Sequence, residues 1–155
     1  MTNKFKIIVD SRENKPWSFN KTSRCEGSEV QALSTGDYSI KSFEDKFAIE
    51  RKASVSELAK NLHEQRWFNC LRRLSSYDFS CIICEFNMSD IMKFPVGSSI
   101  PRRRWRFLKV KPSFIVRHLS IIQIKFGVSV FLADNASYAQ DMALSLMKRF
   151  IDDIK

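Results

Sequence analysis

Two carboxylates and a lysine stand close together in the segment 36–53. Asp37 comes first, and Glu50 and Lys52 follow in one Glu-Arg-Lys string. Carboxylate oxygens suit a hard divalent cation such as Mg²⁺, which keeps several waters and also binds phosphate oxygens. A lysine beside such an ion can position a nucleophile or offset developing charge. These residue types therefore predict metal-assisted hydrolysis of a phosphodiester bond.

Alternating apolar and polar residues on both sides of Glu44-Asp45 predict a β-hairpin in the same segment. A turn centred on that acidic pair places Asp37 opposite Lys52 and diagonal to Glu50. The diagonal separates the two backbones by roughly 7–8 Å, so both carboxylates can lean onto one ion. Because side chains alternate along a strand, Glu50 and Lys52 share a face and Arg51 points away.

A structural role for the same residues stays open. Exposed hairpins commonly carry cross-strand pairs of acidic and basic residues, and such pairs contribute little to stability. Two carboxylates that converge without close partners would instead destabilise the sheet, and a bound cation would remove that cost. The spacing alone does not choose between a surface of ion pairs and a metal site.

The composition is that of a soluble globular protein, with 44% hydrophobic and 28% charged residues in a chain of 155. We expect one domain over residues 1–155. The 26 Lys and Arg against 17 Asp and Glu give a net charge of +9, which favours a polyanionic partner such as nucleic acid without identifying one. No apolar run approaches the roughly 18–20 residues that span a bilayer, so we expect an intracellular protein with no membrane partner.

Strands and helices alternate along the chain and must position the charged residues. Apart from the hairpin, apolar runs and apolar residues at helical spacing predict strands over 5–10, 79–86 and 128–132 and helices over 54–77, 112–126 and 136–151. The stretch 92–111 reads as an irregular basic loop. This order predicts an α/β fold with a central mixed β-sheet flanked by helices. Cys81 and Cys84 point to opposite faces of their strand, which disfavours a zinc site and favours free thiols.

Three strings carry a resemblance to a known family. They are Ile8-Val-Asp-Ser-Arg-Glu13, Leu33-Ser-Thr-Gly-Asp-Tyr-Ser-Ile40 and Ile49-Glu-Arg-Lys-Ala-Ser54. In this order and spacing they resemble the nuclease domain of XPF-type structure-specific endonucleases, within the PD-(D/E)xK nuclease superfamily. The resemblance covers nearly the whole chain. It implies a restriction-endonuclease-like fold and Mg²⁺- or Mn²⁺-dependent cleavage of branched or structured DNA, in DNA repair or recombination.

The resemblance also implies roles for particular residues. Asp37, Glu50 and the backbone carbonyl of Arg51 look like metal ligands, and Lys52 looks like the residue that orients the attacking water. The family commonly has an aspartate shortly after the Glu-Arg-Lys string where this chain has a serine. Whether the neighbouring Glu57 takes that role is open.

The string around Asp10 adds further candidates. By resemblance, Asp10 and Glu13 are acidic site residues, although both also suit the ordinary polar end of a strand. Arg12 either pairs with these acids or contacts DNA. Arg66 lies on the apolar stripe of its helix, where it either reaches a phosphate or a site carboxylate, or extends its charged end to solvent.

The loop 92–111 contains the most basic string of the chain. Arg102, Arg103 and Arg104 precede Trp105 there, and no apolar periodicity places them in a core. We expect these four residues to contact DNA through phosphates and base stacking. Trp17 fits packing better than stacking on a base.

Residues 114–126 are apolar on nearly every face of their predicted helix, which therefore must be covered on both sides. Either the helix after Asn135 encloses it or a second copy does, and the resemblance favours a homodimer through these C-terminal helices. The tandem helix-hairpin-helix and helicase domains of many family members are missing from this sequence. DNA affinity must then come from this domain or from a separate helicase or DNA-binding partner.

Two other functions compete with the endonuclease. A catalytically silent DNA-binding or scaffold subunit of a nuclease complex is possible because some relatives have lost their site, but the intact Asp37, Glu50 and Lys52 argue against it. An RNA-acting enzyme is not excluded, because phosphate contacts carry no information on base or sugar.

Overall fold

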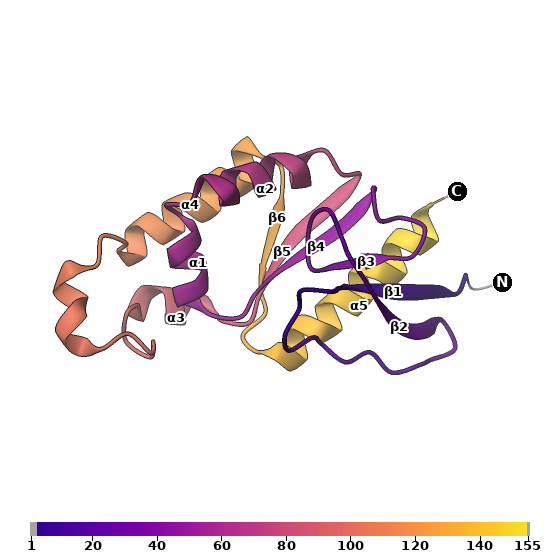
Figure 1. Cartoon of the computed structure of the whole chain (residues 1–155), viewed down its shortest axis with the longest axis horizontal. Helices are drawn as coiled ribbons and strands as arrows, with labels where there is room; N and C mark the ends of the chain where they lie inside the picture. Colours follow the sequence, from indigo (N-terminus) through magenta and orange to yellow (C-terminus); the bar gives the residue numbers. More distant parts are fainter. Residues whose placement is uncertain (1–2, 155) are drawn as a thin grey trace.

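A computed structural model describes residues 3–154. Its strands are β1 Phe5–Asp10, β2 Cys25–Gln31, β3 Tyr38–Ile40, β4 Phe47–Lys52, β5 Phe79–Cys84 and β6 Ser129–Leu132. They form one sheet in the order β2-β1-β3-β4-β5-β6 (Figure 1). Strand β3 is antiparallel to both of its neighbours, and the other pairs are parallel. The predicted α/β fold with a mixed sheet flanked by helices is confirmed.

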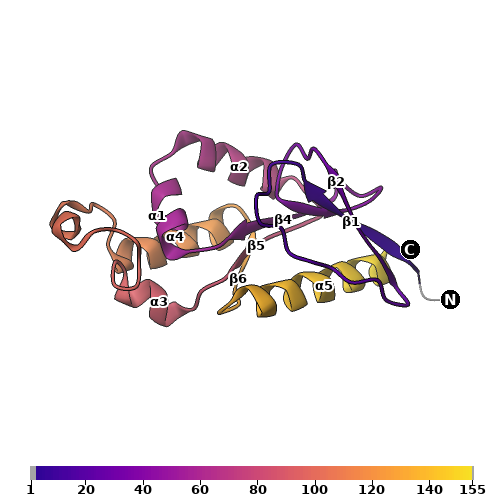
Figure 2. The same cartoon turned by 60° about the horizontal axis from the view of Figure 1, so that its bottom comes forward.

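Helices lie on both faces of this sheet. They are α1 Val55–Asn61, α2 Gln65–Ser75, α3 Met88–Lys93, α4 Pro112–Lys125 and α5 Ala136–Asp153, with a 3₁₀ helix η1 at Arg102–Phe107. Figure 2 shows α5 on the side of the sheet opposite α1 and α2, and separate apolar clusters fill the two sides. Cys81 and Cys84 belong to different clusters, as their spacing predicts. No helix within residues 3–154 is long and apolar enough to cross a bilayer.

Helices α4 and α5 have close to the predicted bounds because local signals set their ends. Pro112 occupies the first turn of α4, and Gly127 follows its end with a φ of +65°. Asn135 caps α5 by accepting a hydrogen bond from the backbone N–H of Tyr138. Each signal lies within a few residues of the boundary that it determines.

The predicted helix over 54–77 is two helices, which corrects the first expectation. The first helix begins where predicted, with Ser54 as its N-cap, but the chain bends between Asn61 and Gln65. The apolar spacing continues through the bend because both helices bury residues in the same cluster, with Leu58 on α1 and Leu71 on α2. The apolar spacing therefore correctly indicated that both segments face one core, but it did not reveal the bend between α1 and α2.

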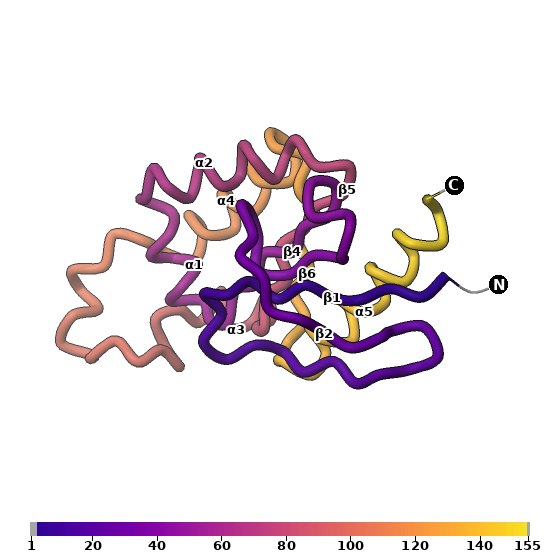
Figure 3. The backbone as a smooth tube through the Cα atoms, turned by 45° about the vertical axis from the view of Figure 1, so that its right-hand side comes forward, coloured from indigo at the N-terminus to yellow at the C-terminus, as the bar shows by residue number. Residues whose placement is uncertain are grey.

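Three further elements were not predicted: β2, α3 and the 3₁₀ helix η1, which lies within the stretch predicted to be an irregular loop. Strand β2 has the sequence Cys-Glu-Gly-Ser-Glu-Val-Gln, which lacks an apolar pattern because it is an edge strand paired only with β1. Helix α3 begins after the predicted strand 79–86 and overlaps the first residues of the predicted loop, and a capping box between Asn87 and Asp90 begins it. The rest of the loop, residues 95–111, is an arm that extends beyond α1, away from both termini (Figure 3).

The predicted hairpin register is wrong by two residues. Tyr38 pairs with Ile49, which puts Asp37 across from Glu50 and not across from Lys52. The turn is displaced because Phe43 packs against Phe150 of α5, with ring centroids 5.8 Å apart. This contact with a distant helix is invisible in the hairpin sequence. The correction brings the two carboxylates closer than the predicted diagonal does.

The two C-terminal helices do not cover each other. Ile115, Leu119 and Ile122 of α4 are buried on the side of α1 and α2, whereas α5 packs on the opposite face of the sheet. Enclosure of α4 by α5 is therefore wrong. Phe114 and Ile124 on α4 remain 40% and 88% exposed.

Candidate active site

The backbone of Asp37 is held between two strands. Its N–H donates to the Ile49 carbonyl at 2.8 Å, and its own carbonyl accepts from the Asp10 N–H at 2.8 Å. Gly36 precedes it with a φ of +81°, and a Cβ there would lie 3.1 Å from the Ile49 oxygen. Only glycine fits this close approach without strain. The backbone of Gly36 and Asp37 thus determines the position from which the Asp37 side chain extends.

Glu50 and Lys52 lie side by side on one face of β4, as strand alternation predicts. The Lys52 Nζ is 3.1 Å from a Glu50 oxygen and 4.5 Å from the centroid of the Trp67 ring. Lys52 is only 4% exposed. A cation buried to this degree requires partners, and Glu50 and the aromatic face provide them.

The carboxylates of this face outnumber the cations that neutralise them. Burial and the charge of Glu50 raise the pKa of Asp37 to about 8, although the Arg51 N–H donates to its Oδ2 at 2.8 Å. Burial also raises the pKa of Glu50, against the opposing effect of Lys52. Burial therefore disfavours the ionised form of both acids, and the charge of Glu50 disfavours that of Asp37 further. A cation between them would stabilise both charges.

A cavity of about 270 Å³ opens onto these side chains. Its walls include six residues singled out from the sequence: Asp10, Arg12, Asp37, Glu50, Lys52 and Arg66. These residues come from β1, the loop before β3, β4 and α2, so the fold gathers them from segments that are distant in sequence. Glu13, Arg51 and the basic string of the arm are not in its walls.

The donor set of the cavity fits a hard divalent cation. Within residues 3–154 no group of three or more His, Cys, Asp or Glu side chains is spaced to hold a metal ion. Asp37 and Glu50 with one backbone carbonyl would leave several positions to water, which is the coordination that Mg²⁺ prefers. The buried Oδ1 of Asn61 in the cavity wall also has no hydrogen-bond partner among the described residues. A water or a ligand would satisfy that oxygen.

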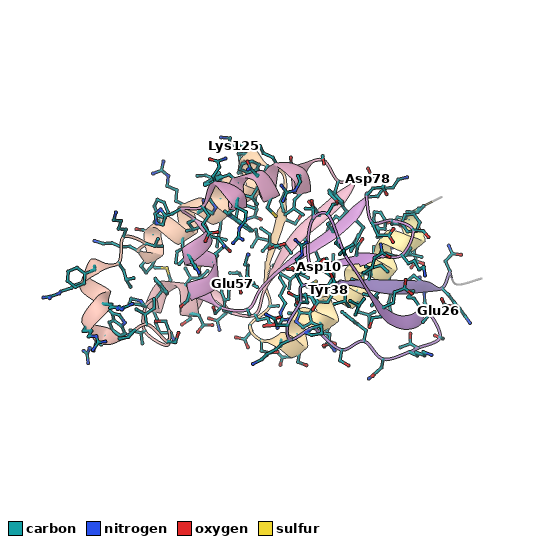
Figure 4. All side chains as sticks on the ribbon, viewed as in Figure 1. Asp10, Glu26, Tyr38, Glu57, Asp78 and Lys125 are labelled. Atoms are coloured by element: carbon teal, nitrogen blue, oxygen red, sulfur yellow. The ribbon has the colours of Figure 1, made fainter. Side chains whose placement is uncertain are left out.

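Asp10 lines the cavity but is already bonded. Its carboxylate accepts from the Leu33 N–H and from Arg12 Nε, each at 2.8 Å. Burial alone would raise the Asp10 pKa, but these two donors lower it below its usual value. Asp10 therefore stays ionised and ties the end of β1 to the loop before Asp37. Figure 4 labels Asp10 near the centre of the molecule, with Glu57 on α1.

Glu13 and the Arg51 side chain lie on the other face of the sheet. An Arg51 nitrogen is 3.1 Å from a Glu13 oxygen, and another is 2.9 Å from a Glu85 oxygen. The Tyr38 hydroxyl donates to Glu13 at 3.1 Å. The predicted opposite orientation of Arg51 and Glu50 is confirmed. Glu13 belongs to this ion-pair network and does not reach the cavity.

Trp17 is part of the same network. Its ring stacks on Tyr38 with centroids 4.5 Å apart, and its indole N–H donates to Glu85 at 2.8 Å. Trp17 is 5% exposed. The prediction that it packs is confirmed.

Glu57 stands beside Lys52 but outside the cavity wall. Its carboxylate accepts from the Ala53 N–H at 2.9 Å, and its own N–H donates to the Ser54 hydroxyl at 3.1 Å. A second oxygen lies 3.8 Å from Lys52 Nζ. Glu57 thus stabilises the start of α1 and adds negative charge next to Lys52.

Arginines surround the mouth of the cavity. The Arg66 side chain is 84% exposed and pairs with Glu64 at 3.0 Å, so it extends to solvent at the cavity edge. Arg73, which had no predicted role, donates to the Thr35 hydroxyl at 3.0 Å and links α2 to the loop before Asp37. The shared helical face of Arg66 and Arg73 was the signal that could have found it.

His118 contacts the site through Trp67, although it had no predicted role. It is 4% exposed, and its Nε2 accepts from the Trp67 indole N–H at 3.0 Å. Burial lowers the pKa of His118, which favours the neutral form that can accept this bond. Because Trp67 also contacts Lys52, His118 holds the ring against which that lysine lies.

The predicted DNA contacts fall into two places. Arg12 and Arg66 lie at the cavity, whereas Arg102, Arg103 and Arg104 are exposed on the arm. Trp105 is half-buried there, and its indole N–H donates to the Ile100 carbonyl at 2.9 Å. Trp105 therefore helps to hold the arm together, and part of its ring is covered.

Comparison with known proteins gives a family and a fold. XPF from Aeropyrum pernix superposes with a TM-score of 0.63 at 22% identity, covering 94% of this chain and 61% of that chain. XPF from Aeropyrum pernix in complex with DNA gives 0.61 at 22% identity, covering 95% and 64%. This chain thus spans less than two thirds of either, and the likeness concerns the fold. No curated protein matches it. The model of the ERCC4 domain matches residues 9–146, from the end of β1 into α5 and across the whole cavity, so the chain belongs to the ERCC4 domain family.

Proposed function

We propose that this chain is a metal-dependent DNA endonuclease that cuts branched or structured DNA within one domain. The observation that carries the proposal is the pair Asp37 and Glu50, whose charges lack sufficient cations, next to the buried Lys52 on one cavity. Membership of the ERCC4 domain family and the similarity to an XPF structure in complex with DNA support it. The expected processes are DNA repair and recombination.

Asp37 and Glu50, with the backbone carbonyl of Arg51, would hold Mg²⁺ or Mn²⁺. When bound, such an ion lowers the pKa of a water and stabilises charge on the phosphate. Lys52 keeps its proton, because Glu50 and Glu57 raise its pKa against the lowering effect of burial. A protonated lysine is a donor only, so Lys52 orients the attacking water and does not deprotonate it. Cleavage would leave a 5′-phosphate and a 3′-hydroxyl.

The remaining residues of the cavity place the substrate. Arg12, Arg66 and Arg73 put positive charge around the acidic centre, where the phosphates flanking the cut bond would lie. Asp10 holds Arg12 in this position through their ion pair at 2.8 Å. The arginines thereby attract the strand, and the acids act only on the phosphate that enters the cavity.

A cleavage assay on a panel of substrates tests the proposal. Single-stranded, duplex, flap, fork and splayed DNAs and their RNA counterparts are incubated with the protein and Mg²⁺ or Mn²⁺, with EDTA as the control. We expect metal-dependent cuts in the branched DNAs. Binding of these DNAs without any cleavage would instead identify a catalytically silent subunit, and preferential cutting of RNA would identify an RNA-acting enzyme.

We also propose that two copies associate through the C-terminal elements. Phe114 and Ile124 leave an apolar surface on α4, and the neighbouring β6 is an edge strand of the sheet. A two-fold pair would cover the same surface on both copies. Sedimentation equilibrium should show a dimer that Ile124→Asp dissociates. A monomer at the highest soluble concentration would contradict the pairing.

A further inference from the structure

The net charge of the chain comes entirely from one segment. Between Asp90 and Asp134 there are nine Lys and Arg residues and no Asp or Glu. The other 17 Lys and Arg of the chain equal its 17 Asp and Glu. This segment contains the arm and α4, whereas the cavity lies mainly on residues outside it. The excess positive charge of the chain is therefore concentrated in a segment that does not contain the proposed catalytic residues.

A second hollow lies on the arm. It has a volume of about 530 Å³ and is lined by Arg103, Arg104, Arg106, Phe107 and Leu108. None of these residues lines the catalytic cavity. Phe107 is 68% exposed, which is unusual for a large aromatic side chain, and the Arg106 guanidinium lies 4.7 Å from its ring centroid. Exposed cations thus surround an exposed aromatic ring.

The arm that carries this hollow is held by hydrogen bonds within it and by packing against the body of the domain. The Trp105 indole N–H donates to the Ile100 carbonyl, and the Leu108 N–H donates to the Trp105 carbonyl at 3.1 Å. Ile100, Leu108 and Val110 pack against the apolar cluster of α1 and α4. The outward position of Phe107 consequently follows from a folded platform beneath it.

We propose that the hollow on the arm binds an unpaired nucleotide of a DNA strand, with the base stacked on Phe107 and the flanking phosphates on Arg103 and Arg104. The inference rests on the proposed function, because it takes DNA as the substrate. It gives the role of stacking on a base to Phe107, whereas the sequence predicted that role for Trp105. The catalytic cavity and the hollow then contact different parts of one substrate.

The combination of groups selects this ligand. Arginines alone bind the phosphates of any nucleic acid, but an aromatic ring stacks only on a base whose face is free. Bases inside a duplex are stacked on each other, so Phe107 favours a single strand. An acidic peptide would use the arginines and leave the ring without a partner. The hollow therefore favours an unpaired strand over a duplex and over an acidic peptide.

Binding measured without cleavage tests the role of Phe107. Fluorescence anisotropy with a labelled oligo-dT strand and a blunt duplex is recorded in EDTA. Phe107→Ala should weaken binding of the strand by about 5- to 100-fold and leave duplex binding unchanged. Phe107→Trp should retain the affinity. Tyr138→Ala, which removes another exposed aromatic residue at the start of α5, is the matched control and should have no effect.

The arginines are tested by salt dependence. The double change Arg103→Ala and Arg104→Ala should weaken strand and duplex together and reduce the salt slope for the strand by about 0.7 log unit per lost contact. Lys148→Ala with Arg149→Ala on α5 is the control. Equal loss of strand and duplex binding in Phe107→Ala, or no loss in either, would overturn the proposal, as would equally tight, Phe107-dependent binding of poly-glutamate. Because no cleavage is measured, a protein that binds in this way but never cuts would contradict only the proposed function.

Discussion

On one face of β4, Arg51 contacts Glu13 and Glu85, and both acids receive further hydrogen bonds from Tyr38 and Trp17. On the other face, Glu50 lies across from Asp37, and among residues 3–154 the one ion pair of these two acids is that between Glu50 and Lys52. The two faces use the same residue types at adjacent positions. They differ in whether the acids have enough partners.

That difference separates a structural network from a binding site. Acids that are fully paired have no need of an added cation. On the other face, burial raises the pKa values of Asp37 and Glu50, and the charge of Glu50 raises that of Asp37 further. A fold can keep two buried acids that destabilise it where a bound ligand later stabilises their charges. The comparison therefore favours a structural role for the Arg51 face and supports the proposed catalytic role of the Asp37 face.

The largest effect is expected on cleavage when an acid of the Asp37 face is neutralised. Asp37→Asn or Glu50→Gln should lower the cleavage rate by about 10³-fold or more, because each removes charge from the proposed metal site. Thermal unfolding in EDTA should show a stability equal to or above that of the wild type, since repulsion is relieved. Glu64→Gln at the cavity edge is the control. A mutant that is inactive because it unfolds would argue for a structural role instead.

Breaking the Arg51 face should reverse this pattern. Arg51→Met leaves Glu13 and Glu85 without their cation and should cost about 3 kcal/mol of unfolding free energy, measured by urea denaturation. Arg66→Met removes an exposed arginine and should change stability by less than about 0.5 kcal/mol. An Arg51→Met protein as stable as the wild type would show that the network does not stabilise the fold.

Lys52→Ala should separate orientation of water from metal binding. We expect a loss of about 10²-fold in cleavage, comparable to removal of one positioned catalytic group, with the metal still bound. Calorimetry on the same variant measures the metal affinity. If the affinity vanished with the lysine, the role of Lys52 in orienting water would be wrong.

The smallest effect is expected on the pH dependence of stability, when His118, which accepts a hydrogen bond from Trp67, is replaced. Burial holds the folded-state pKa of His118 below the value of about 6.5 that a free histidine has. Above that value His118 is neutral in both states, and its contribution to stability is complete. As the pH falls below it, the unfolded chain takes up the proton first and stability is lost. His118→Gln should flatten this decline in urea denaturation, and His63→Gln, at an exposed position, should not.

The sequence predicted what local signals determine. The Glu-Arg-Lys string gave the shared face of Glu50 and Lys52, and Pro112 and Asn135 gave the starts of α4 and α5. Strand alternation correctly placed Arg51 on the opposite face. In each case the decisive residues lie within a few positions of one another.

What depends on distant contacts was missed. The packing of Phe43 against α5 shifted the hairpin register, and the pairing of β2 with β1 made a strand out of a polar segment. Glu13 was expected among the acids of the site from the family resemblance, but its carboxylate pairs with Arg51 on the other face of the sheet. Trp67, which joins Lys52 to His118, required the three-dimensional arrangement of α2 and α4.

Metal binding tests the central claim most directly. The wild-type protein, Asp37→Asn and Arg66→Met are titrated with Mn²⁺ by calorimetry at neutral pH. The account predicts saturable binding to the wild type and to Arg66→Met, and loss of that binding in Asp37→Asn. Undiminished Mn²⁺ binding by Asp37→Asn, or no binding by the wild type, would contradict the assignment of the Asp37 face as the metal site.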